Sequence, residues 1–171
     1  NLFVFFYTHF ATAKTYSHAL MENWLQEYDD PKQRKALEKA GYTKEWDLTV
    51  YRQAVTGNDY AACDTLLFDM IQSYRTYFNQ PEAPFVFGVM PKQTSGAQPF
   101  TEWINGWMVK PKPGGLSLLV YDHVDSNYWG SVFEQYAHQA VTLTHDLRMQ
   151  EAGRQIGTAR AGSVPYAFFR K

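Results

Sequence analysis

Residues 2–25, LFVFFYTHFATAKTYSHALMENWL, decide the fold. Residues 2–7 are continuously apolar or aromatic, which is the pattern of a β-strand buried on both faces. After a short polar turn, bulky side chains recur every four residues at Tyr16, Leu20 and Trp24, and this spacing places them on one face of a helix. The stretch therefore predicts a buried strand followed by an amphipathic helix.

The same alternation of strand and helix continues along the chain. Further buried strands are predicted over 85–90 and 116–121, with shorter ones over 140–143 and 164–169, and amphipathic helices separate most of them. Buried strands that alternate with helices form βαβ units with parallel strands. The sequence therefore predicts an α/β fold: a three-layer, mainly parallel sheet of four to five strands with helices on both faces.

Length and composition indicate one folded domain. The chain has 171 residues, of which 45% are hydrophobic and 19% charged, enough apolar side chains for a full core. It starts with Asn and enters a strand at once, so we expect residues 1–171 to be a single domain excised from a longer chain. Aromatic residues reach 17%, and such side chains dominate both protein cores and protein interfaces.

Charge, cysteine content and hydropathy exclude several classes of protein. The formal net charge is −1, which gives no basic field for nucleic acid. The single cysteine, Cys63, excludes an internal disulfide and a multi-thiolate zinc site. No apolar run approaches the about 20 residues that span a bilayer, and the first strand is too short for a signal peptide. We predict a cytoplasmic protein with neither nucleic-acid nor membrane partners.

Polar residues follow the predicted strands, at the edge where α/β sheets bind ligands. The first strand ends in Thr8-His9, the third in Asp122-His123, and the fourth is followed by His145. If the strands are parallel, these residues share one edge, and Asp122, His123 and His145 are then candidate catalytic residues. The alternative interpretation is that polar residues stand there because loops need helix caps.

The loop after the first strand has the spacing of a phosphate-binding loop. In that motif two glycines let the backbone curl around phosphate, a lysine neutralises charge, and a hydroxyl holds Mg²⁺. Here Thr8 and Ala13 replace the glycines, while Lys14 and Thr15 keep the last two positions. The stretch resembles a degenerate P-loop NTPase motif over eight residues. The resemblance implies phosphate binding by Thr8, His9, Lys14 and Thr15, with ATP and Mg²⁺ as cofactors.

The missing glycines weaken that interpretation. A residue with a Cβ forced to positive φ costs about 1–2 kcal/mol, and its side chain crowds the phosphate. We therefore predict a P-loop-like fold that has lost nucleotide binding and needs no cofactor.

Two further kinds of site have weaker sequence support. His123 and Asp125 supply an imidazole and a carboxylate, which suit a transition metal, but no second spaced pair accompanies them. Asp122 and His123 with Ser95 supply the groups of a hydrolase, but the chain contains no Gly-x-Ser-x-Gly elbow. Cys63 falls on the apolar stripe of a predicted helix and is expected in the core.

With no intact catalytic motif, the function we predict is a non-catalytic protein-interaction or regulatory domain. Its partner would be another protein or another domain of the same chain, met through part of the aromatic surface. Two alternatives stay open: a nucleotide- or phosphate-binding domain that uses Lys14 and Thr15, and a metal-dependent or His/Asp-dependent hydrolase at the same edge.

Overall fold

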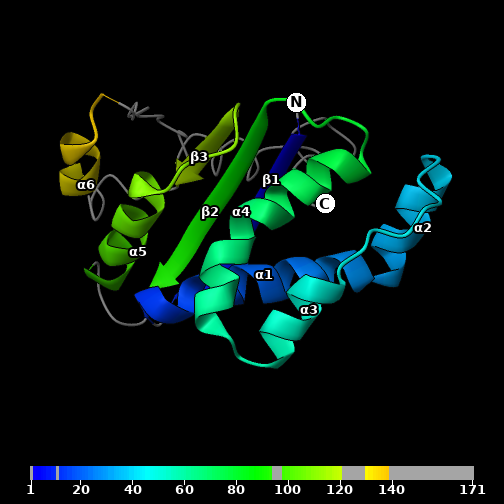
Figure 1. The fold of residues 1–171 in the computed structure, drawn as a ribbon, viewed down its shortest axis with the longest axis horizontal. Helices are drawn as coiled ribbons and strands as arrows, with labels where there is room; N and C mark the ends of the chain where they lie inside the picture. The colour runs from blue at the N-terminus through cyan, green and yellow to red at the C-terminus, as the bar shows by residue number, and fades with distance from the viewer. Residues whose placement is uncertain (1, 11, 94–97, 121–129, 139–171) are drawn as a thin grey trace, which may run out of the picture. The chain divides into compact units, whose positions relative to one another are not determined.

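The computed structural model describes residues 2–10, 12–93, 98–120 and 130–138, and this part of the chain is mixed α/β (Figure 1). Strands and helices alternate along it, as predicted. In chain order the elements are β1 (Leu2–Phe10), α1 (Ala13–Asp29), α2 (Pro31–Lys39), α3 (Thr49–Thr56), α4 (Tyr60–Tyr77), β2 (Phe85–Gln93), α5 (Gln98–Val109), β3 (Leu116–Val120) and α6 (Gly130–Gln135).

The three described strands form one parallel sheet in the order β1-β2-β3. Figure 1 shows them side by side, with β1 at one edge and β3 at the other. The register places Phe5 beside Gly88 and Gly88 beside Leu119. The predicted parallel pairing is therefore confirmed for these strands, and their carboxyl ends lie at a common edge of the sheet.

The strand order also determines which face of the sheet the helices cover. The chain steps from β1 to β2 to β3 in one direction. Crossovers between parallel strands are almost always right-handed, so two steps in the same direction put both sets of helices on one face. The predicted helices on both faces, three layers and four to five strands are not confirmed. The strands predicted over 140–143 and 164–169 lie outside the described residues.

The core lies between the helices and one face of the sheet, which we call the covered face. Phe6 and Phe87, on adjacent strands of this face, are almost completely buried. The Trp24 ring of α1 lies against both, at centroid distances of 5.5 and 5.9 Å. From α5, the Trp107 ring stacks on Phe87 at 5.7 Å. Such ring pairs add about 0.5–1.5 kcal/mol beyond the area they bury, so aromatic packing ties α1 and α5 to the sheet.

The apolar stripes predicted for the helices are buried. In α1, Tyr16, Leu20 and Trp24 all face the core, as the four-residue spacing predicts. α5 has a similar stripe, whose aromatic and aliphatic members are all buried: Phe100, Trp103, Ile104 and Trp107. The tryptophans of α5 thus pack inside the fold and offer little surface to a partner.

Local capping sets the ends of the helices. Asp30 caps α2 by accepting a hydrogen bond from the backbone N–H of Lys32, and Pro31 follows at the first helical position. Gly41, with φ of +92°, lies just beyond this helix, in the left-handed region that glycine favours. Asp59 caps α4 through the backbone N–H of Ala62. Each of these ends has a local sequence signal, whereas α3 has none.

Candidate functional site

The carboxyl ends of β1 and β2 form the described part of the predicted ligand edge. The register pairs Thr8 with Pro91 and His9 with Lys92, so these backbones run side by side. The other residues predicted for this edge, Ser95, Asp122, His123, Asp125 and His145, lie outside the described residues. The predicted catalytic and metal sites therefore stay predictions.

The turn from β1 to α1 is built as a helix cap. β1 continues through Phe10, so Thr8 and His9 are strand residues paired with β2, and α1 begins three positions later at Ala13. Thr12 Oγ1 accepts a hydrogen bond from Thr15 N at 3.3 Å and lies 2.9 Å from the Thr15 hydroxyl. Because the strand takes up three of the eight motif residues and the helix three more, little chain is left to curl around a phosphate.

Lys14 lies on the exposed side of α1. Its Nζ lies 5.9 Å from the centroid of the Tyr60 ring at the start of α4, a cation–π contact. His18, one turn further along α1, contacts the same ring at 5.3 Å and hydrogen-bonds through Nε2 to the carbonyl oxygen of Val55 at 3.0 Å. These contacts join the first turns of α1 and α4, and they give the predicted phosphate-binding lysine a structural role.

A partly buried polar network connects α1, α4 and α5 with the residue that follows α5. Ser17 is 1% exposed, and its hydroxyl donates to Asp64 Oδ1 at 2.9 Å while accepting from Trp103 Nε1 at 3.0 Å. The Lys110 ammonium group pairs with the other carboxylate oxygen of Asp64 and donates to its backbone carbonyl at 3.0 Å. Sequence analysis missed this network because its members are far apart in the chain. With Ser17 inaccessible to solvent, the network holds helices together.

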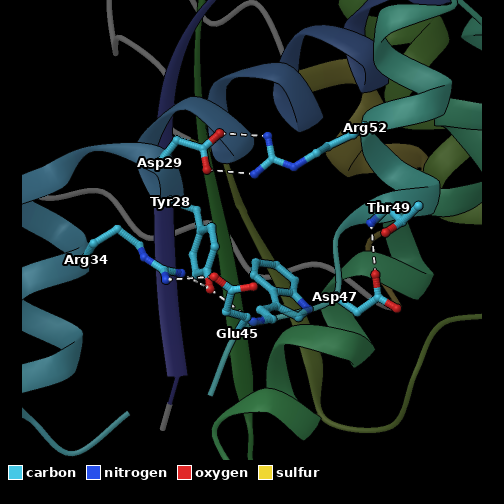
Figure 2. A network of polar contacts seen from close by, with 8 residues as sticks. Tyr28, Asp29, Arg34, Glu45, Asp47, Thr49 and Arg52 are labelled. Atoms are coloured by element: carbon cyan, nitrogen blue, oxygen red, sulfur yellow. Dashed lines mark hydrogen bonds and ion pairs between the residues drawn. The ribbon is translucent and has the colours of Figure 1, made fainter. Parts of the chain in front are cut away.

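A second polar network lies where α1 ends, beside a cavity of about 410 Å³ (Figure 2). Arg52 of α3 binds Asp29 through two parallel hydrogen bonds of 2.6 and 2.7 Å. Arg34 of α2 donates to the Tyr28 hydroxyl at 2.5 Å and lies 3.5 Å from a Glu45 carboxylate oxygen. The hydrogen bond from Arg52 lowers the pKa of Asp29. The two arginines are each matched with a carboxylate, which ties α1, α2, α3 and the segment before α3 together. The remaining carboxylate on this cavity, Asp47, accepts a hydrogen bond from the backbone N–H of Thr49.

A larger cavity of about 690 Å³ lies next to this network. On its wall the Tyr51 hydroxyl donates to Asp69 Oδ2, and Trp46 Nε1 donates to Ser73 Oγ, both at 2.7 Å. Burial raises the pKa of Tyr51 to about 12, and the hydrogen bond to Asp69 adds to the increase. These polar groups bond to one another across α3 and α4, and so they explain how the helices pack rather than indicating a reaction.

The face of the sheet opposite the helices carries a group of large, exposed apolar side chains. Phe3, Phe5 and Tyr7 of β1 are 56%, 38% and 55% exposed, and Leu119 of β3 is 42% exposed. We call these four residues the aromatic face. The rings of Phe3 and Phe5 are stacked, with centroids 6.3 Å apart and planes within 8°. The prediction that β1 is buried on both faces is therefore not confirmed.

Gly88 gives the aromatic face its shape. It lies in β2 between Phe5 and Leu119, and a Cβ built there would lie 2.4 Å from Cδ2 of Phe5. The Phe5 ring therefore lies over the backbone of β2, in the space that the missing side chain leaves. A glycine inside an apolar strand was the one sequence signal for this arrangement, because it marks close approach of another group.

Metal clusters and membrane-spanning helices are two other features considered for the part of the chain that the structure describes. There, no group of three or more His, Cys, Asp or Glu side chains is arranged to hold a metal ion. None of the helices in these ranges has both the length and the apolar character to cross a membrane. Comparison with protein-family models, with curated proteins and with solved structures finds no match to this chain.

Proposed function

We propose that this chain is a non-catalytic interaction or regulatory domain that binds its partner through the aromatic face. The observation that supports this most is the contrast between the two faces of β1. Phe6, on the covered face, is 1% exposed, while its neighbours Phe5 and Tyr7 remain open to water. Contiguous exposed rings of this kind mark protein interaction surfaces, where aromatic side chains are enriched.

The size of the patch fits this role. At about 200 Å² for each ring, the exposed fractions of Phe3, Phe5 and Tyr7 amount to about 300 Å² of aromatic surface. Burying that area is worth about 7 kcal/mol before the cost of association, which itself is about 4–15 kcal/mol. The patch alone therefore supports weak binding, and tight binding requires further contacts around it.

The finer architecture is part of the same proposal. A layer of helices over the aromatic face would complete three layers, and the predicted sheet of four to five strands would extend the surface on which that layer packs. In this proposal the partner is either another protein or another domain of the same chain. We place the domain in the cytoplasm, which suits the lone, buried thiol of Cys63, whose pKa burial raises to about 11.

Site-specific photo-crosslinking tests the proposal. A benzophenone amino acid replaces Tyr7 on the aromatic face, or Lys35 on the exposed surface of α2 as the matched control, in cells that express the full chain. We expect a covalent protein adduct from position 7 only, and a lower yield when Phe3→Ser is added. Adducts of equal yield from the two positions, or none from position 7, would refute the proposal.

A second candidate function is phosphate or nucleotide binding near Lys14. The observation in its favour is that α1 starts beside the carboxyl ends of β1 and β2, where the helix dipole favours an anion. A thermal shift with ATP and Mg²⁺ tests it. Stabilisation that disappears in Lys14→Ala would favour this function over the interaction domain, and we expect no stabilisation. The His/Asp-dependent hydrolase rests on Asp122, His123 and His145, and so on sequence alone.

A further inference from the structure

The outer edge of β1 is as notable as the aromatic face beside it. β1 hydrogen-bonds to β2 along one side, and among the described residues no strand pairs with its other side (Figure 1). At nine residues it is longer than β3, the five-residue strand at the opposite edge. A strand edge carries a row of backbone donors and acceptors that another strand can bind.

β1 lacks the features that usually prevent such pairing. Natural edge strands are blunted by lysine, proline, bulges or inward-pointing charges. The sequence of β1, LFVFFYTHF, contains no lysine, arginine, carboxylate, proline or glycine. With a formal net charge of only −1, the chain as a whole also offers little electrostatic repulsion between copies. The edge is therefore suited to pairing with a second apolar strand.

We propose that the partner is a second copy of this chain, bound along the outer edge of β1 by antiparallel pairing of the two β1 strands. This inference rests on the proposed function, since β1 carries three of the four residues of the aromatic face. A twofold axis at Phe5 sets Phe5 opposite its own copy and Phe3 opposite Tyr7 of the second copy. All six rings then lie on one face of a sheet that is continuous between the two copies. Cross-strand aromatic pairs of this kind are the ones that stabilise sheets.

Pairing along the strand edge sets the six rings side by side, so each ring buries the side that meets its neighbour and keeps its outer surface open. Backbone hydrogen bonds along β1 and these lateral ring contacts stabilise the dimer. The interface is isologous, so the same nine residues serve both copies and closure at two subunits follows from the symmetry.

Sedimentation equilibrium of the full chain and of two double variants tests the pairing. We expect the wild-type chain to reach twice its mass of 19.8 kDa as its concentration rises. Phe3→Lys with Tyr7→Lys sets like charges opposite each other twice, and should weaken dimerisation by about tenfold or more. Phe3→Lys with Tyr7→Glu removes the same rings but sets opposite charges across the axis, and should dimerise more tightly than the double lysine variant.

Circular dichroism of both variants separates loss of pairing from loss of folding. A wild-type chain that stays monomeric at every concentration, or folded variants that dimerise equally, would overturn the inference. The photo-crosslink at position 7 gives an independent result that needs neither variant. An adduct of two copies supports the second copy as partner. An adduct with a different protein overturns this inference while leaving the proposed function intact, and no adduct overturns both.

Discussion

Replacing Gly88 with Ala perturbs the aromatic face at the point where two strands meet most closely. The new methyl carbon would lie 2.4 Å from Cδ2 of Phe5 and 3.3 Å from two further atoms of that ring. The backbone of Gly88 is not among the glycines with positive φ, so the substitution causes no backbone strain. The whole cost therefore comes from moving the Phe5 ring.

Two effects of opposite sign set the magnitude. Overpacking of this kind costs about 1–3 kcal/mol, while replacing glycine by alanine inside a strand gains about 0.5–1 kcal/mol. We expect Gly88→Ala to lower the free energy of unfolding by about 0.5–2 kcal/mol when Phe5 is present. In a Phe5→Ala background the clash is gone, and the same substitution should raise it by about 0.5–1 kcal/mol.

A double-mutant cycle in urea at 25 °C measures this change of sign. The coupling energy between positions 5 and 88 should be about 1–3 kcal/mol, and all four proteins should share one m-value. If Gly88→Ala changed the free energy of unfolding by the same amount in both backgrounds, the Phe5 ring would not occupy the space beside Gly88.

Three other predictions concern the polar side chains. Arg75 is 1% exposed, and its Nε and Nη2 have no hydrogen-bond partner in the described part of the structure. Because these buried polar atoms are unpaired, Arg75→Met should stabilise the protein by about 1–2 kcal/mol. A fall in the calorimetric Tm would contradict this. Ser17→Ala removes the acceptor of Trp103 Nε1 and should cost about 1–3 kcal/mol in urea unfolding, whereas a neutral result would show that the bond contributes nothing. Arg52 lowers the pKa of Asp29, so their ion pair stabilises the fold above the unfolded pKa of Asp29 and is lost as the pH falls through the lower folded pKa. Asp29→Asn should therefore lower the free energy of unfolding by at most about 1 kcal/mol at neutral pH, since the pair is half exposed, and should not change it in strong acid. Urea titrations at both pH values measure this, and an equal loss at both would contradict the prediction.

The local elements could be predicted from the sequence because their signals are local. Continuous apolar runs located the strands, and four-residue spacing located the buried face of α1. The eight-residue helix α3 escaped prediction for the same reason. Its N-cap, Leu48, makes no side-chain hydrogen bond, and only Tyr51, Ala54 and Val55 are buried along it.

The open face and the polar networks depend on long-range arrangement, which no local pattern contains. A run such as residues 2–7 looks the same whether one face or both faces of its strand are covered. The difference comes from strand order and from the hand of the crossovers. Ser17 and Asp64 are likewise brought together only by the packing of α1 on α4. For the ligand edge, the sequence correctly placed the ends of β1 and β2 together, and Thr12 caps the helix that follows β1.

The order of strands also has a consequence for folding kinetics. Leu2 pairs with Phe85, whereas Phe85 pairs with the much nearer Leu116. From these separations, closing the longer loop costs about 0.9 kcal/mol more chain entropy than closing the shorter one. The βαβ unit of β2, α5 and β3 should then assemble first and β1 should join late. Until it joins, an uncharged nine-residue strand is exposed on every side, which makes dilution and low temperature the favourable conditions for refolding this protein.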